Sequence, residues 1–158
     1  MLVDLFKGFA VTFKHIFKQR HTFSYPEVKR PQPSNFRGRH RLQRYANGLE
    51  RCVGCSLCAA VCPSEAIYLE AKENTPENQV SAGERYAEIY QIHQLRCIWC
   101  GFCEEACPED AIVMGPEYEL SNYRRQQFVA EKEDMLDPPE RGFGEPMDLP
   151  VNVRLSSD

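Results

Sequence analysis

The clearest pattern of apolar and polar positions lies at the start of the chain. Large apolar side chains recur there at intervals of three or four residues, the spacing of one helical face, and fall within an arc of roughly 120°. The pattern predicts an amphipathic helix over residues 1–21. Its apolar positions are Leu2, Leu5, Phe6, Phe9, Phe13, Ile16 and Phe17, and its polar flank carries Lys7, Lys14 and Lys18.

This helix is not expected to cross a membrane. It has no uninterrupted apolar run long enough to span a bilayer, and no basic segment followed by an apolar stretch and a small-residue cleavage site. We expect it to lie on a membrane surface or in a groove of a partner protein. The alternative is a helix that covers this protein's own core.

Strand-like stretches occur further along the chain and belong to an internal repeat. Residues 86–92 are rich in aromatic and β-branched side chains, and shorter stretches of strand character lie at 67–70 and 112–114. An Ala-Ile pair at residues 66–67 recurs 45 positions later, at 111–112. The repeat therefore predicts two similar units in one small domain.

All eight cysteines fall into two copies of one pattern, at the same 45-residue offset. Each copy has the form C-x2-C-x2-C-x3-C-P, which is typical of a bacterial-type [4Fe–4S] site, and two copies are typical of a two-cluster ferredoxin. Three cysteines spaced by two residues can wrap a short loop around three corners of a cubane. This pattern alone indicates electron transfer.

In such proteins the fourth cysteine of each run binds the other cluster. Crossed ligation ties the two halves together and holds the clusters close enough for electron tunnelling. The predicted iron ligands are Cys52, Cys55, Cys58 and Cys107 for cluster 1, and Cys97, Cys100, Cys103 and Cys62 for cluster 2.

Two other uses of the cysteines have to be considered. A disulfide framework also needs an even number of cysteines, but it favours an oxidising compartment and a secretory signal. Structural zinc favours separate C-x2-C pairs, and the third and fourth cysteines of each run fit that spacing poorly. Both alternatives are weaker than the iron–sulfur interpretation.

The order of elements in each unit predicts the fold. Each run reads as a ligand loop, a short helix near the fourth cysteine and a short strand. Two such units related by a pseudo-twofold axis predict an α+β, ferredoxin-like two-cluster core over residues 48–116. So small a core needs its clusters for stability, and we expect the cluster-free chain to be poorly folded. Candidate apolar neighbours of the clusters are Val53, Leu57, Ile67, Ile98 and Ile112.

The flanking regions differ in charge. Residues 1–51 carry 11 Lys and Arg against 3 Asp and Glu, whereas residues 52–158 carry 8 against 20. A basic extended arm at 22–47 suggests contact with an anionic membrane face or an acidic partner, the alternative being a solvated charged stretch. No nucleic-acid-reading motif accompanies the arginines. Residues 117–158 are expected to form a C-terminal helix and an extended tail, without a recognisable site at 138–158.

Segments around the cysteines carry a more specific signal. They are F-R-G-R-H at 36–40, R-Y-A-N-G-L-E-R-C at 44–52, G-E-R-Y at 83–86, L-R-C-I-W-C-G-F-C-E-E-A-C-P at 95–108, Y-E-L at 118–120 and K-E-D-M-L at 132–136. The chain resembles the two-cluster ferredoxin-like subunit of respiratory complex I, the TYKY or NuoI type. The resemblance covers roughly residues 34–137.

The resemblance implies an electron-relay subunit of a membrane-associated, proton-translocating NADH:quinone oxidoreductase. Such a subunit passes single electrons through two [4Fe–4S] clusters towards the terminal cluster that reduces quinone, and it has no bond-making catalytic residue. NADH and flavin bind to other subunits, in line with the lack of a nucleotide-binding glycine loop in this sequence. The implied partners are the other peripheral-arm and membrane-arm subunits, at the cytoplasmic face of a bacterial inner membrane.

Other proteins share the cysteine runs. Ferredoxin-dependent and hydrogenase-type membrane complexes contain an equivalent subunit, and a free soluble ferredoxin also carries two clusters. The F-R-G-x-H and G-E-R-Y segments favour the respiratory form. The amphipathic helix and the basic arm argue against a free carrier.

A few side chains beside the motifs are expected to support the site. Arg37 and His40 should anchor the arm through polar contacts, with a place at the border of the quinone-proximal region as the alternative. His93 should end a strand or lie near a cluster. Trp99 should pack over a cluster or fill space beside it.

Overall fold

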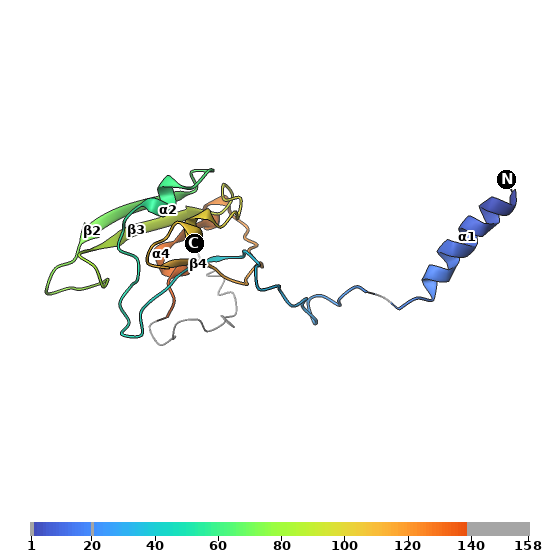
Figure 1. The fold of residues 1–158 in the computed structure, drawn as a ribbon, viewed down its shortest axis with the longest axis horizontal. Coiled ribbons are helices and arrows are strands. Elements are labelled where there is room, and N and C mark those ends of the chain that lie inside the picture. The colour runs from blue at the N-terminus through green and yellow to red at the C-terminus, as the bar shows by residue number, and fades with distance from the viewer. Residues whose placement is uncertain (1, 20, 139–158) are drawn as a thin grey trace. The chain divides into compact units, whose positions relative to one another are not determined.

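The computed structural model describes residues 2–19 and 21–138 and contains two compact units, Met1–Gln32 and Pro33–Asp158. The first unit contains helix α1, Leu2–Ile16 (Figure 1). Its presence confirms the helix predicted from the apolar spacing. That spacing stops at Phe17, and the helix ends one residue earlier. Every residue of α1 is exposed, and no helix among the described residues is long and apolar enough to cross a membrane.

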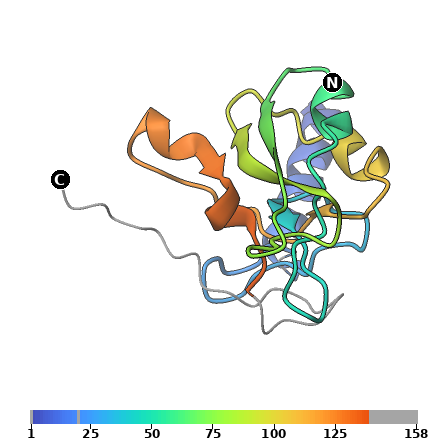
Figure 2. The same cartoon turned by 90° about the vertical axis from the view of Figure 1, so that its left-hand side faces the viewer.

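Two small antiparallel sheets frame the second unit (Figure 1). In the larger one, β3 (Arg85–His93) lies between β2 (Ile67–Glu73) and β5 (Val129–Glu131). The strands β2 and β3 form a long hairpin and run side by side in Figure 2. The smaller sheet pairs β1 (His40–Leu42) with β4 (Ile112–Met114). All three stretches of predicted strand are therefore strands.

Short helices complete the described part of this unit. The single-turn helices α2 (Leu57–Ala60) and α3 (Phe102–Glu105) pack against each other. Each contains the third cysteine of its run and ends two residues before the fourth, near which a short helix was predicted. A 3-10 helix, η1 (Arg125–Phe128), and the short helix α4 (Lys132–Met135) precede and follow β5.

The compact unit extends beyond the predicted core of residues 48–116 at both ends. Upstream, β1 completes a sheet with β4, so residues 33–47 belong to the folded unit rather than to an extended arm. Downstream, β5 joins the hairpin, and the Asp137 N–H donates to the Leu42 carbonyl at 2.8 Å. The physical reason is that the short strands of the cysteine core have backbone groups that need partners, and both flanks supply them.

One cluster of buried side chains connects these elements. Ala87 and Tyr90 are both buried although they lie three positions apart on β3. A register shift between Glu70 and Ala71 on β2 breaks the strict alternation of a flat strand and permits this arrangement. The cluster consists of Leu42, Cys58, Ala87, Tyr90, Ile92, Cys103, Ile112, Ala130 and Met135.

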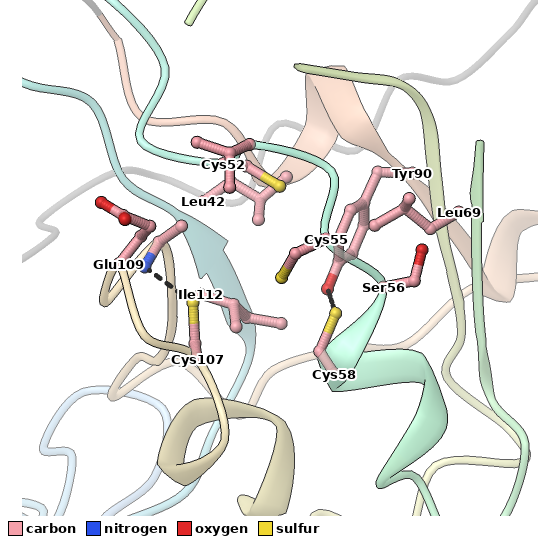
Figure 3. Close-up of a pocket in the computed structure, with 12 residues that line it drawn as sticks. Leu42, Cys52, Cys55, Ser56, Cys58, Leu69, Tyr90, Cys107, Glu109 and Ile112 are labelled. Atoms are coloured by element: carbon pink, nitrogen blue, oxygen red, sulfur yellow. Dashed lines mark hydrogen bonds between the residues drawn. The ribbon is translucent and has the colours of Figure 1, made fainter. Parts of the chain in front are cut away.

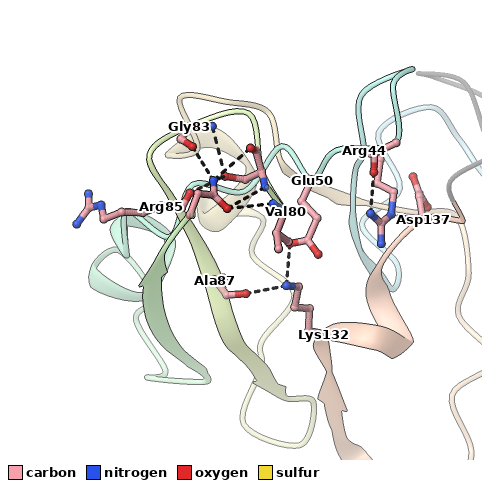
Figure 4. A network of polar contacts seen from close by, with 11 residues as sticks. Arg44, Glu50, Val80, Gly83, Arg85, Ala87, Lys132 and Asp137 are labelled. Carbon is pink, nitrogen blue, oxygen red and sulfur yellow. Dashed lines mark hydrogen bonds and ion pairs between the residues drawn. The ribbon is translucent and has the colours of Figure 1, made fainter. Parts of the chain in front are cut away.

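Buried charges hold the C-terminal segment to the core (Figure 4). The Lys132 Nζ lies 2.7 Å from the Glu50 Oε2 and donates to the Ala87 carbonyl at 2.7 Å. The Arg41 guanidinium donates to both carboxylate oxygens of Asp137, at 2.8 to 3.0 Å. Each ion pair therefore joins a residue in the first part of this unit, Arg41 or Glu50, to a residue in its last described segment, Asp137 or Lys132.

Candidate metal centre

The two cysteine runs share the same backbone turns at positions 45 residues apart. Each run contains three residues in the left-handed region, two before its short helix and one after it. This region is strained for most side chains, so its recurrence at matched positions is a specific feature of the local fold. The matched pairs are Gly54 and Trp99 (φ 64° and 57°), Ser56 and Gly101 (65° and 80°), and Glu65 and Asp110 (48° and 45°).

The fourth cysteines also have matching contacts. The Ala66 N–H donates to Cys62 Sγ at 3.3 Å, and the Ala111 N–H donates to Cys107 Sγ at 3.2 Å. A backbone donor stabilises a thiolate more than a neutral thiol. Both fourth cysteines therefore accept a backbone hydrogen bond from the residue four positions later.

One cavity collects cysteines from both runs (Figure 3). Cys52, Cys55 and Cys58 of the first run line it together with Cys107 of the second. These are the four residues predicted for cluster 1. Tyr90 and a set of apolar side chains complete the wall. The apolar ones include Leu42, Val53, Leu69 and Ile112.

The other four cysteines are also neighbours. Burial raises the pKa of Cys97, and the nearby thiols of Cys62 and Cys100 raise it further. Burial likewise raises the pKa of Cys103 to about 12, with further contributions from Cys58, Cys97 and Cys100. Because Cys103 interacts with Cys58 as well, the two groups of thiols adjoin each other.

The ionisation of the remaining thiols follows their surroundings. Burial raises the pKa of Cys52 to about 11 and also raises that of Cys58. For Cys62, burial opposes the thiolate, but hydrogen bonds from the Ala66 N–H and the Ser64 hydroxyl outweigh it and lower the pKa. The most buried thiols are therefore neutral at pH 7 without a metal, and a metal must displace their protons to bind.

This donor set suits an iron–sulfur cluster. Within residues 2–19 and 21–138, no three or more His, Cys, Asp or Glu side chains gather around the position of a single metal ion. In a four-iron cluster each thiolate binds a different iron, so the sulfurs surround a shared space rather than one point. All eight cysteines are free thiols, so the structure contains no disulfide among them.

Two side chains that lie far from their partners in the sequence also approach cysteine sulfurs. The Tyr90 hydroxyl lies 3.2 Å from Cys58 Sγ (Figure 3), and His40 Nε2 lies 3.8 Å from Cys97 Sγ. Burial lowers the pKa of His40 to about 4. The His40 ring also contacts Trp99, with 5.1 Å between ring centroids. Sequence reasoning missed Tyr90, and it expected no ligand contact from His40.

Arg37 and His93 hold the second cysteine run from outside it. Arg37 donates to the Cys100 carbonyl and to the Glu105 carboxylate, the latter at 3.0 Å, which confirms that it anchors its segment. His93 is the last residue of β3, as predicted, and its carbonyl accepts the Cys97 N–H at 3.0 Å.

The predicted apolar neighbours of the clusters are only partly correct. Val53 and Ile112 line the cavity, and Ile67 packs against the buried core. The prediction was wrong for Leu57 and Ile98, which are 48% and 61% exposed. Each adjoins a cysteine of its run that turns inward, and neighbouring side chains on so short a turn point in different directions.

The fold and the two groups of thiols define a protein of the two-cluster iron–sulfur class. Residues 51–111 match the family model described as "4Fe-4S dicluster domain". This match confirms the cofactors predicted from the cysteine runs, two [4Fe–4S] clusters, and the mixed helix and strand character of the domain.

Similar proteins identify the family. The chain is 53% identical over 135 residues to NADH-quinone oxidoreductase subunit 9 of Thermus thermophilus, covering 85% of this chain and 74% of that protein. The same values hold for NADH-quinone oxidoreductase subunit I from a second strain of that species. Subunit I 1 of Symbiobacterium thermophilum is 48% identical over 143 residues, covering 90% of this chain and 88% of that protein. The chain belongs to the NADH-quinone oxidoreductase subunit I family, which confirms the resemblance found in its sequence.

Among solved structures, one chain from the membrane-bound sulfane sulfur reductase, an archaeal respiratory membrane complex, has a TM-score of 0.49 and 26% sequence identity. The similarity covers 74% of this chain and 56% of that chain.

Proposed function

We propose that this chain is an electron-relay subunit of an NADH-quinone oxidoreductase and that single electrons pass through its two [4Fe–4S] clusters. The observation that carries the proposal is the cavity that Cys107 shares with Cys52, Cys55 and Cys58 (Figure 3). A cysteine of the second run beside three of the first is the arrangement of a two-cluster ferredoxin. Membership of the subunit I family supports the place of this relay in the oxidoreductase.

The proposed ligand sets are crossed. Cys97 interacts electrostatically with both Cys62 and Cys100, which supports the inclusion of Cys62 in the second set. The matched turns and the matched backbone donors to the fourth cysteines support a pseudo-twofold relation between the runs. The sets are Cys52, Cys55, Cys58 and Cys107 for cluster 1, and Cys97, Cys100, Cys103 and Cys62 for cluster 2.

The chain's own residues hold and shield the redox groups. Apolar side chains and the buried third cysteines exclude water from the ligand loops, and a dry environment with few donors helps to set a cluster's reduction potential. Cys55 is the one exposed cysteine of the eight. Cys55 would therefore hold cluster 1 from the surface side, where a redox partner could approach. We assign no catalytic residue and no NADH, flavin or nucleic-acid site to the chain.

We also propose that helix α1 lies on the membrane surface, at the cytoplasmic face of a bacterial inner membrane. Its exposed apolar side chains recur at helical spacing and are accompanied by lysines, which suits the boundary between an apolar layer and anionic headgroups. The other peripheral-arm and membrane-arm subunits are the proposed protein partners. The basic residues ahead of the folded unit suit an acidic neighbour or the same anionic surface.

Isolation of the native complex tests the relay function. The chain is tagged at its C-terminus, membranes are solubilised in mild detergent, and a native gel is stained for NADH oxidation. A very large band that oxidises NADH and reduces quinone is expected. A large band that is inactive with NADH would transfer the proposal to a ferredoxin- or hydrogen-linked complex, and a small brown protein in the soluble fraction would overturn it.

Paired cysteine variants test the crossed ligands. Cys107→Ser should alter the same cluster signal in electron paramagnetic resonance as Cys55→Ser, because both residues are assigned to cluster 1. Cys62→Ser should alter the same signal as Cys100→Ser. If Cys107→Ser instead changes the signal that Cys100→Ser changes, each run binds its own cluster and the crossed sets are wrong.

A further inference from the structure

We propose that Tyr90 raises the reduction potential of cluster 1 by donating a hydrogen bond to the Cys58 thiolate. The proposal rests on the ligand sets proposed above, in which Cys58 belongs to cluster 1. Tyr90 lies on β3, opposite Leu69 of β2, and is 1% exposed. Its ring forms part of the cavity wall, and its hydroxyl points to Cys58 Sγ at 3.2 Å (Figure 3).

The chemistry of the cluster-bound state fixes the direction of this hydrogen bond. A cysteine bound to iron is a thiolate and has no proton to give. The Tyr90 hydroxyl is then the donor, and Cys58 Sγ is the acceptor. Cys58 is itself only 7% exposed, so water competes little for the sulfur. A buried hydroxyl without a partner is costly, which keeps the contact in place.

A donor at a ligand sulfur acts on the reduction equilibrium. Reduction adds one negative charge to the cluster, part of which is shared by the thiolates, so a hydrogen bond to sulfur stabilises the reduced state more than the oxidised state. If the bond differs in strength between the two states by a typical hydrogen-bond contribution, the reduction equilibrium constant changes about tenfold. For a one-electron couple a tenfold change corresponds to about 59 mV.

The contact is specific to the first run. Cys103, the matched residue 45 positions after Cys58, is also 7% exposed. Both sulfurs accept a backbone hydrogen bond, from the Ala59 N–H at Cys58 and from the Glu104 N–H at Cys103. Among the described residues, only Cys58 of this matched pair also has a side-chain hydroxyl bonded to it. The Tyr90 hydroxyl therefore bonds to a ligand assigned to cluster 1, although Cys103, assigned to cluster 2, is close enough to interact with it electrostatically.

The test compares reduction potentials of the full-length chain with both clusters bound. Tyr90→Phe keeps the ring and removes the hydroxyl. In a redox titration followed by electron paramagnetic resonance, cluster 1 should become about tenfold harder to reduce, a shift of about 59 mV to lower potential, while cluster 2 keeps its potential. The titration should show one reduction step for each cluster. Cys55→Ser replaces a ligand assigned to cluster 1 and leaves those of cluster 2 in place, so the step that it alters belongs to cluster 1.

Tyr68→Phe is the matched control. Tyr68 lies on the neighbouring strand β2, is 53% exposed, and bonds to Glu70 rather than to a cysteine. Loss of the Tyr68 hydroxyl should change the reduction potential of neither cluster. Unchanged potentials in Tyr90→Phe, or an equal shift of both steps, would overturn the proposal.

Two further readouts separate this proposal from the function it rests on. A fluorinated tyrosine at position 90 is a stronger donor of nearly the same shape, and it should move the cluster 1 step to higher potential even if Tyr90→Phe fails to retain the cluster. Failure to move the step upward would count against the hydrogen bond. Absence of two iron–sulfur clusters from the unsubstituted chain, by iron and sulfide analysis, would instead overturn the proposed function.

Discussion

Replacement of Lys132 by methionine tests the buried charges that hold α4 to the cysteine core. The Lys132 Nζ contacts the Glu50 carboxylate and the Ala87 carbonyl, each at 2.7 Å (Figure 4), and lies 5.3 Å from the centre of the Tyr86 ring. The side chains of Lys132 and Glu50 are 11% and 5% exposed. Glu50 stands two residues before Cys52, so this ion pair also fixes the start of the first ligand loop.

The expected magnitude follows from the burial of the pair. Methionine keeps most of the volume of Lys132 but leaves Glu50 as a buried carboxylate without its cation. Removal of one partner from a buried ion pair costs about 3–5 kcal/mol. The lost donor to the Ala87 carbonyl falls within this range, because contacts of one ammonium group are not additive. Lys72→Met should change stability little, since Lys72 pairs with Glu88 at the exposed surface.

Urea unfolding of the cluster-bound chain, followed by circular dichroism, measures the effect. With a slope of about 2 kcal/mol per M, the midpoint of Lys132→Met should fall by about 1.5–2.5 M. Lys72→Met should unfold close to the unsubstituted chain. Combining Lys132→Met with Glu50→Leu should recover much of the loss, because it removes both charges. If Lys132→Met shifts the midpoint no more than Lys72→Met, or if the double variant recovers nothing, the buried ion pair does not hold α4 to the core.

Three other expectations follow from the same structure. Gly38→Ala should destabilise the second unit by about 1–3 kcal/mol, since its Cβ would overlap the Glu117 carbonyl oxygen; an unchanged unfolding midpoint would contradict this. Gly8→Ala should stabilise α1 by about 0.5–1 kcal/mol, visible as increased helical circular dichroism, because nothing lies within 4 Å of the added methyl group. Chelators should remove the clusters faster as the pH falls, because the released Cys52 and Cys103 thiols, with pKa values of about 11 and 12 in the cluster-free fold, take up protons. A pH-independent loss of visible absorbance would argue against this coupling.

Local sequence signals were sufficient to predict the strands of the cysteine core, but they did not predict strand β1. Residues 67–70, 86–92 and 112–114 have strand composition, and each lies in a strand. In β1, by contrast, the basic residues predicted an extended arm in contact with an anionic membrane face or an acidic partner. Arg41 is buried because Asp137, 96 positions later, neutralises it. A pairing at that separation leaves no periodic signal in either segment.

In the candidate site, too, local sequence patterns predicted some of the residues and missed others. The proposed iron ligands could be chosen from the sequence because a cubane requires fixed spacing between cysteines, and both runs have it. The contact between Tyr90 and Cys58 could not be predicted from the sequence. The register shift between Glu70 and Ala71 places both Ala87 and Tyr90 inside, whereas strict alternation would have turned one of them outward.

The two runs have the same ligand spacing and turns but different neighbours, and Gly54 and Trp99 show why. At Gly54 an added Cβ would lie 3.0 Å from the Tyr86 carbonyl and from the Ala71 side chain, so the hairpin leaves space only for glycine. Trp99 adopts nearly the same left-handed φ, and its ring packs against His40 instead. The strain of that backbone is tolerable because the ring buries apolar surface. The neighbours of each run can therefore change separately, so two clusters with one ligand pattern can have unequal potentials within a single chain.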